Sequence, residues 1–160
     1  TDAAGATPTP TDAAGATPTS TPIPTPVLSG NFSEGAPGSA FTFTATGLPP
    51  ATNLFIRING VLLAAQIRSD AVGDATFVLS TTEQAAVGKY TTEVGIVQTI
   101  PSTRLQQAAL ASARYTLAAD APVRVPAAGS PPPIIIPASI APLDPSTLQR
   151  VYLPFVVRQM

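Results

Sequence analysis

The distribution of proline constrains the fold of this chain more than any other feature. Of its 19 prolines, six lie in residues 1–26 and nine in residues 118–160. Proline cannot donate a backbone hydrogen bond and pushes the preceding residue out of the helical region, so such stretches exclude regular helices and central strands. We therefore predict an extended Thr/Pro-rich arm at 1–26, a folded domain at 27–117 and a second Pro-rich arm at 118–160.

The first arm contains a ten-residue near-repeat, because TDAAGATPT occurs at residues 1–9 and again at 11–19. The arm holds eight threonines, and Asp2 and Asp12 are its only charged residues. This composition is typical of an extended linker or stalk, and of O-glycosylation. It buries almost nothing by itself, so an ordered arm would have to lie on another surface. The candidate O-glycosylation sites are Thr7, Thr9, Thr17 and Thr19.

The segment FTFTATG in the central domain has the alternation of a β-strand. Phe41, Phe43 and Ala45 fall on one face, and three threonines fall on the other. A period of two residues is typical of a strand with one buried face. The two phenylalanines are therefore expected in the core.

An Asn-Gly pair at residues 59–60 separates two apolar runs, 53–58 and 61–69. It predicts a tight hairpin, because both central turn positions need positive φ. Two more strands are expected at 75–80 and 90–97. Short strands about ten residues apart predict a sandwich or barrel.

Residues 104–117 are rich in Ala, Leu, Gln and Arg, which are good helix formers. Their place at the end of a series of strands favours a final strand instead. We predict a strand from Ala111 onward, with Tyr115 and Leu117 on one face. The residues before Ala111 are expected to form a loop or a helical turn.

The second arm contains two apolar segments, at 134–136 and 151–157, each bounded or interrupted by proline. Proline cannot donate to a ladder, so these segments are expected as edge strands or as extended pieces docked by their side chains. They are too apolar to be left in water. A second hydrophobic cluster or a neighbouring molecule has to cover them.

A family resemblance is visible by residues 35–97. Four stretches carry it: EGAPGSAFTFTATGLPP, which begins at Glu34, LFIRINGVLL, the Gly73/Asp74 turn into ATFVLSTT, and VGKYTTEV. Together they resemble the Ig-like modules of bacterial surface proteins. The closing RVYLPFVVR resembles a Tyr-Leu-Pro-hydrophobic tail on exported proteins of filamentous thermophilic bacteria, often after Thr-Pro linkers. The resemblance implies a single all-β Ig-like sandwich with long Pro-rich arms. It also implies a binding or spacer module, with no catalytic motif to carry over.

The residue types exclude several kinds of chemistry. The chain has no histidine and no cysteine, which excludes Ser-His-Asp and Cys-His catalysis and any metal site built from those residues. The nine acidic residues show no spacing suited to a catalytic carboxylate pair. One lysine and seven arginines are scattered along a chain of net charge −1, which argues against binding of nucleic acid. We predict a protein that is not an enzyme and has no cofactor or metal.

Two small motifs leave alternatives open. Asp70 and Asp74 flank the turn SDAVGD and could bind calcium, but turn geometry is the favoured interpretation. Lys89, the only lysine, could form a cross-link to an asparagine beside an acid, but an exposed lysine after a Gly turn is favoured. The residues considered for that cross-link are Asn53, Asn59 and Glu93.

Asn31 begins the N-glycosylation sequon Asn-Phe-Ser, a motif short enough to occur by chance. The three tyrosines could form a sugar- or peptide-binding face, but core or rim packing is favoured because they share no short spacing. These tyrosines are Tyr90, Tyr115 and Tyr152.

The chain begins with Thr and carries no basic-then-apolar leader. We expect a mature chain whose targeting peptide was removed, and therefore an extracellular or cell-surface protein, although a shortened chain would look the same. No apolar run approaches the roughly 18 residues needed to span a bilayer.

Two extended arms, few charges and no candidate active site favour a filament subunit. A tail docked on the next copy makes a head-to-tail contact, which generates rings or helical filaments. The partner is then the chain itself, with covalent glycans as a further expectation. The alternative is a monomeric cell-surface module on a Thr-Pro stalk that binds glycan or protein. The expected assembly contacts are Ile23, Val27, Leu28, Ile134, Ile135, Ile136, Val151, Tyr152, Leu153 and Phe155.

Overall fold

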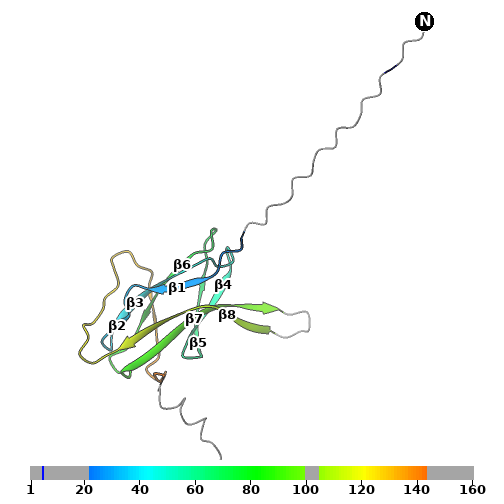
Figure 1. Cartoon of the computed structure of the whole chain (residues 1–160). Helices are drawn as coiled ribbons and strands as arrows, with labels where there is room; N and C mark the ends of the chain where they lie inside the picture. Colours follow the sequence, from blue (N-terminus) through cyan, green and yellow to red (C-terminus); the bar gives the residue numbers. More distant parts are fainter. Residues whose placement is uncertain (1–4, 6–21, 100–104, 144–160) are drawn as a thin grey trace, which may run out of the picture.

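The protein is all-β in the residues that its computed structural model describes, which are Gly5, 22–99 and 105–143. Two sheets pack together, an arrangement compatible with a β-sandwich (Figure 1). Within the described ranges no helix is long and apolar enough to cross a membrane. The strands are β1 (Val27–Gly30), β2 (Glu34–Gly35), β3 (Ala40–Thr46), β4 (Asn53–Ile58), β5 (Val61–Arg68), β6 (Ala75–Ser80), β7 (Gly88–Thr99), β8 (Leu105–Leu117) and β9 (Pro133–Ile135).

The order of the described strands gives the edges of the two sheets. The first sheet has the order β1-β3-β6-β9, and the second has the order β2-β8-β7-β4-β5. Neighbouring strands are antiparallel except in the pairs β6–β9 and β2–β8, which are parallel. The edge strands are therefore β1 and β9 in one sheet and β2 and β5 in the other.

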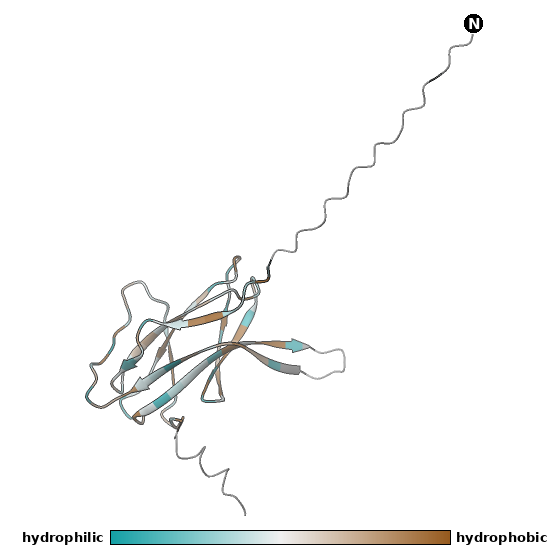
Figure 2. Ribbon diagram, in the orientation of Figure 1, coloured by the Kyte–Doolittle hydropathy of each residue, from teal (hydrophilic) through white to brown (hydrophobic). Residues whose placement is uncertain are grey.

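The predicted strand alternation and the predicted hairpin are both confirmed. Phe41, Phe43 and Ala45 are fully buried on β3, whereas Thr44 and Thr46 are exposed. β4 and β5 pair through a turn in which Asn59 and Gly60 have φ of 50° and 83°. Figure 2 shows hydrophobic and hydrophilic residues interspersed along the strands of both sheets.

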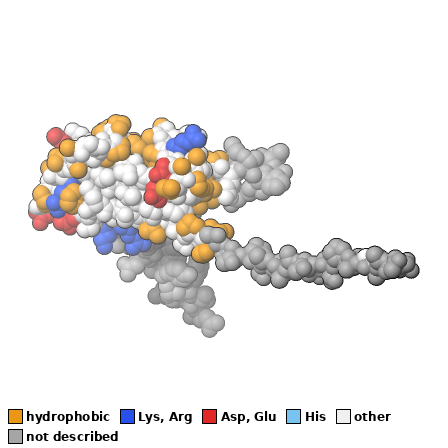
Figure 3. Space-filling view, turned by 90° about the horizontal axis from the view of Figure 1, so that it is seen from above, with side chains coloured by type: hydrophobic (Ala, Val, Ile, Leu, Met, Phe, Trp, Pro, Cys, Tyr) orange, Lys and Arg blue, Asp and Glu red, His pale blue; other side chains and the backbone are white. Residues whose placement is uncertain are grey.

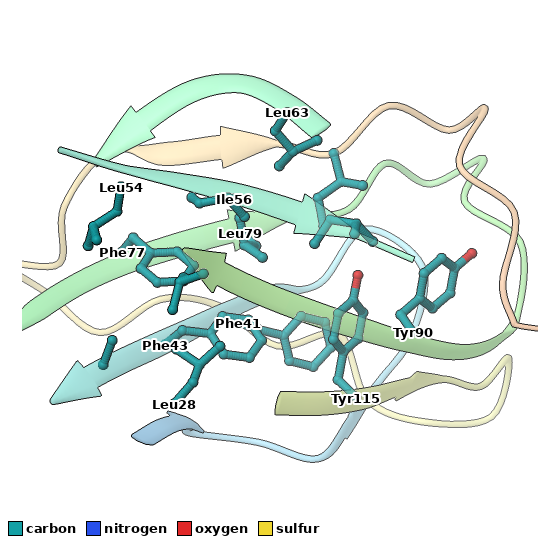
Figure 4. Packing of buried hydrophobic residues seen from close by; sticks show 14 of the residues in the cluster. Leu28, Phe41, Phe43, Leu54, Ile56, Leu63, Phe77, Leu79, Tyr90 and Tyr115 are labelled. Carbon is teal, nitrogen blue, oxygen red and sulfur yellow. The ribbon is translucent and has the colours of Figure 1, made fainter. Parts of the chain in front are cut away.

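The core lies between the sheets and is built around aromatic rings (Figure 4). The ring of Phe41 lies 4.6 Å from that of Tyr115, and the ring of Phe43 lies 5.6 Å from that of Phe77. Aromatic pairs at such separations add about 0.5–1.5 kcal/mol beyond the area that they bury. The inward positions of β3, β6 and β8 thus meet in one cluster.

The prediction for residues 104–117 was wrong in its first half. A strand was expected only from Ala111, but β8 begins at Leu105 and pairs with β7 along its whole length. The ladder runs from Gly88 opposite Leu117 to Thr99 opposite Leu105. Long-range pairing with a long neighbour here overrides the helix propensity of Leu, Gln and Ala.

The chain after residue 117 continues to pack on the two sheets up to Leu143. The N–H of Ala36 donates to the carbonyl of Pro122, and the N–H of Ala40 donates to that of Arg124. Farther along, Ile136 and Ile140 belong to the same hydrophobic cluster as the strands. Residues 134–136 were expected as an edge strand or as a docked segment. The structure places β9 (Pro133–Ile135) at the edge of its sheet beside β6, with Ile136 buried just after it.

Candidate functional site

An apolar groove lies between two sheet edges, β5 of one sheet and β9 of the other. It has a volume of about 610 Å³, within the usual range of ligand pockets. Among the described residues that line it, Ser139 is the only one with a polar side chain. The lining residues are Val61, Leu62, Leu63, Ala64, Ala65, Pro133, Ile134, Ile135, Pro137, Ser139 and Ile140.

The β5 wall is apolar on both faces of its strand. Leu63 points into the core and is buried, whereas Val61 and Leu62 are about half exposed. The strand VLLAAQIR contains no proline, and Arg68 at its end is its only charged residue. Natural edge strands usually carry charges or proline that block pairing with another chain. β5 carries neither along the groove, and no other described strand pairs with its outer edge.

The β9 wall offers side chains but few backbone donors. The N–H of Ile136 donates to Ser80 on β6, and successive residues of a strand direct their backbone groups to opposite sides. The backbone of Ile135 therefore faces away from β6, together with Pro133 and Pro137, which have no N–H to donate. The groove thus has one wall that can extend a sheet and one wall that offers apolar contact.

No charged side chain lines the groove within the described residues. On the face drawn in Figure 3, a few acidic and basic side chains are scattered among apolar and uncharged ones. Coulombic attraction would therefore contribute little to docking there. An occupant would be recognised by apolar side chains and by backbone hydrogen bonds.

The predicted assembly residues fall on different parts of the fold. Ile134 and Ile135 line the groove, and Ile136 is buried beside it. Val27 and Leu28 lie on β1, the opposite edge of the first sheet, with Val27 exposed and Leu28 buried. Ile23 is almost fully exposed, and it lies just before β1, at the sheet edge opposite to β9. The remaining four lie outside the described residues: Val151, Tyr152, Leu153 and Phe155.

Sequence reasoning missed the residues of the β5 wall and Ile140 as parts of a site. A signal for the first was present, because VLLAA is apolar at five successive positions where a strand with one wet face would alternate. Such a run indicates that both faces of the strand lie against something. Ile140 had no comparable signal, since it stands alone between Ser139 and Ala141.

The candidate glycosylation sites are only partly described. Asn31 is exposed after β1, and its side-chain oxygen accepts a hydrogen bond from the N–H of Thr42 at 2.9 Å. Ser33 of the same sequon is exposed as well. The four threonine sites of the first arm, Thr7, Thr9, Thr17 and Thr19, lie outside the described residues.

The Asp70 carboxylate serves the turn between β5 and β6. Its Oδ1 accepts hydrogen bonds from the N–H groups of Val72 at 2.9 Å and Asp74 at 2.8 Å. These backbone bonds, that of Asp74 foremost, lower the pKa of Asp70. Over the described ranges no three His, Cys, Asp or Glu residues gather as a metal site would require. The geometry agrees with the turn interpretation.

Of the two asparagines considered for a lysine cross-link, one is engaged in local hydrogen bonds and the other lies far from Lys89. Asn59 uses its side chain locally, accepting from the N–H of Thr91 and donating to the carbonyl of Ala141, both at 2.7 Å. Asn53 lies at the other end of β4, level with Val97 on β7 by extension of the register. Lys89 is eight residues from Val97 along β7, or about 26 Å at strand spacing.

Tyr90 and Tyr115 are buried in the core, so core packing is confirmed for these two tyrosines. Tyr152 lies outside the described residues. Burial removes both rings from any exposed binding face. An aromatic sugar-binding surface cannot be assembled from them.

In the part of the chain that the structure describes, two packed β-sheets carry an apolar groove at their edges. No protein-family model matches the chain, and no curated protein matches it either. The case for a function therefore depends on the geometry of the two sheets and on the character of the arms.

Proposed function

We propose that this chain is a structural subunit of an extracellular filament, in which Ig-like sandwiches join head-to-tail by docking of extended terminal segments. The strand order supports the Ig-like assignment. β1, β3 and β6 correspond to strands A, B and E, and β4, β7 and β8 correspond to C, F and G. After β1 the chain crosses to the second sheet, where β2 pairs with β8 as a continuation of strand A.

The observation that carries the proposal is the docking of β9. A Pro-rich extended segment after the sandwich adds to the edge of β6, and it anchors itself through Ile136 and Ile140. The chain thus already uses backbone pairing plus buried isoleucines to bind an extended segment. The second apolar segment, 151–157, likewise combines β-branched residues with a proline, and it adds Tyr152 and Phe155. A subunit with an open edge and a spare apolar segment can bind the next copy.

The remaining properties agree with this role. Charged residues make up 11% of the chain, and among the described residues no three His, Cys, Asp or Glu side chains gather in a cluster. The extracellular location rests on the Thr-Pro arm and on the resemblance of the tail. Within the proposal, O-glycans on the arm and an N-glycan at Asn31 would increase the solubility of a surface poor in charge.

Negative-stain microscopy and light scattering test the proposal on three purified chains: the intact chain, a chain lacking 1–26 and a chain lacking 144–160. We expect filaments from the intact chain and from the chain lacking 1–26, because the second arm has more apolar surface to bury. Loss of filaments only without 1–26 would transfer the assembly role to the first arm. Monodisperse monomers from all three chains would contradict the filament.

A second candidate function is a monomeric surface module that binds glycan or protein from a Thr-Pro stalk. The observation that favours it is the β7–β8 hairpin, which extends beyond the other strands (Figure 1). β7 pairs with β4 only up to Gly95, whereas its pairing with β8 continues to Thr99. Val97, Gln98 and Gln107 are exposed on this extension. Monomers in the microscopy experiment would favour this function.

A further inference from the structure

We propose that the groove between β5 and β9 accepts residues 151–157 of a second copy of this chain, as a strand added to β5. This inference rests on the proposed function, and it identifies the two surfaces that meet in the head-to-tail contact between copies. The groove supplies the acceptor, and the last apolar segment of a neighbouring copy supplies the occupant.

The acceptor in this contact is the outer edge of β5. β5 is an eight-residue strand whose one partner among the described strands is β4. Its residues along the groove are uncharged and apolar, and the opposite wall adds the side chains of Ile134, Ile135 and Ile140. Backbone groups on the free side of an edge strand are a template for another strand. An extended apolar segment in this groove would gain backbone hydrogen bonds from β5 and apolar contact from β9.

The direction in which the chain runs at Leu143 favours a second copy, and not the same chain, as the source of the docked segment. The N–H of Leu143 donates to the carbonyl of Lys89 at 2.8 Å, and the bridge between the two residues is antiparallel. β5 and β7 both run antiparallel to β4, so they run parallel to each other. The chain at Leu143 therefore runs opposite to β5 and heads away from the groove.

The length after Leu143 sets what the segment can reach. Seven residues, 144–150, separate Leu143 from Val151, so the connection spans at most about 28 Å. To enter its own groove the chain would have to reverse within those residues. If it continues in the same direction, it carries the apolar segment out to a neighbour, which is the arrangement of a head-to-tail contact.

Pro154 defines how the segment would pair. It has no N–H, so its backbone must face away from β5, as prolines in edge strands do. Val151, Leu153, Phe155 and Val157 then direct their backbone groups to β5. Arg150 and Arg158 flank the apolar run, and charges at these positions keep the two ends of the segment in water.

The absence of cysteine from the chain makes disulfide trapping a direct test. One preparation carries Ala64→Cys, at an exposed position of the β5 wall, and a second carries Leu153→Cys or, in turn, Phe155→Cys. The first preparation also lacks residues 1–26, so that a mixed dimer has its own mass. We expect mixed dimers under mild oxidation, because a disulfide needs Cα atoms within about 7 Å. The matched control pairs Val72→Cys, an exposed turn position outside the groove, with the same partners.

A full chain that carries both Ala64→Cys and Leu153→Cys distinguishes the two sources of the segment. Cross-linked ladders on a non-reducing gel are expected. A cross-link within one chain only would show that the segment docks on its own copy, and it would overturn the second-copy occupant. Mixed dimers no more abundant than with Val72→Cys would overturn the groove as acceptor.

The filament proposal and this inference can fail separately. Filaments of the intact chain without groove cross-links would leave the filament standing and overturn the groove. Groove cross-links between copies without filaments would support the pairing and contradict the polymer. The variant Ala64→Lys adds a charge to the exposed edge and should abolish filaments, whereas Val125→Lys, exposed after β8, should leave them intact.

Discussion

The rings of Tyr90 and Tyr115 lie face to face across β7 and β8, with centroids 5.3 Å apart and planes 9° apart. The Tyr90 hydroxyl donates to the carbonyl of Ala86 at 2.7 Å. The Tyr115 hydroxyl is buried and has no hydrogen-bond partner among the described residues. Two stacked phenols in one core therefore differ in how their polar ends are satisfied.

This difference predicts opposite effects of removing each hydroxyl. Tyr90→Phe should lower the free energy of unfolding by about 1 kcal/mol, because it removes a hydrogen bond. Tyr115→Phe should leave it unchanged or raise it by up to about 1 kcal/mol, because it removes an unsatisfied buried group. Urea unfolding followed by far-UV circular dichroism measures both. A clear loss of stability in Tyr115→Phe would show that its hydroxyl has a partner.

The same tyrosines predict a loss of stability in alkali. Burial raises the pKa of Tyr115 above its usual value of 10.0, with a smaller contribution from the charge of Tyr90, and burial raises the pKa of Tyr90 as well. Above pH 10.0 the unfolded chain therefore releases these protons before the folded chain does. The stabilising effect is complete below that pH and is lost as the pH rises. Thermal unfolding between pH 9 and 12 should show a smaller alkaline loss for Tyr115→Phe than for the natural chain; equal losses would contradict the burial.

The docking of β9 predicts unequal effects at two neighbouring isoleucines. Ile136 is 3% exposed in the core, whereas Ile135 is 59% exposed. Ile136→Ala should cost about 2–5 kcal/mol of folding stability, because it leaves a cavity. Ile135→Ala should change stability by no more than about 0.5 kcal/mol, as surface substitutions usually do. Equal small effects in chemical denaturation would mean that the segment after residue 117 does not belong to the folded core.

The turn at Asp70 predicts a dependence on the acceptor oxygen rather than on a metal. Asp70→Ala should lower the melting temperature because it removes both bonds from Oδ1, whereas Asp70→Asn keeps an oxygen acceptor and should lower it less. The lowered pKa of Asp70 adds stability that is complete above its usual value of 3.8 and is lost as the pH falls through the folded value. Calcium and a chelator should leave the melting temperature of the natural chain unchanged. A rise with calcium would contradict the turn interpretation.

Local features of the sequence were sufficient for the parts of the fold that depend on neighbouring residues. The alternation of FTFTAT placed Phe41 and Phe43 in the core, and Asn59-Gly60 marked the β4–β5 hairpin. A period of two residues and a demand for positive φ are both properties of a few adjacent positions. They can be recognised without knowing what lies across the sheet.

Only the tertiary structure decided the start of β8 at Leu105, the pairing of β9 with β6 and the groove beside β5. Leu62 and Leu63 are identical in type, yet one is about half exposed at the groove and the other is buried. The difference arises because successive side chains of β5 point to opposite faces of the sheet, and only that of Leu63 meets the core. Pairing and burial depend on segments far away in the chain, so the same residue types can end as core or as an open edge.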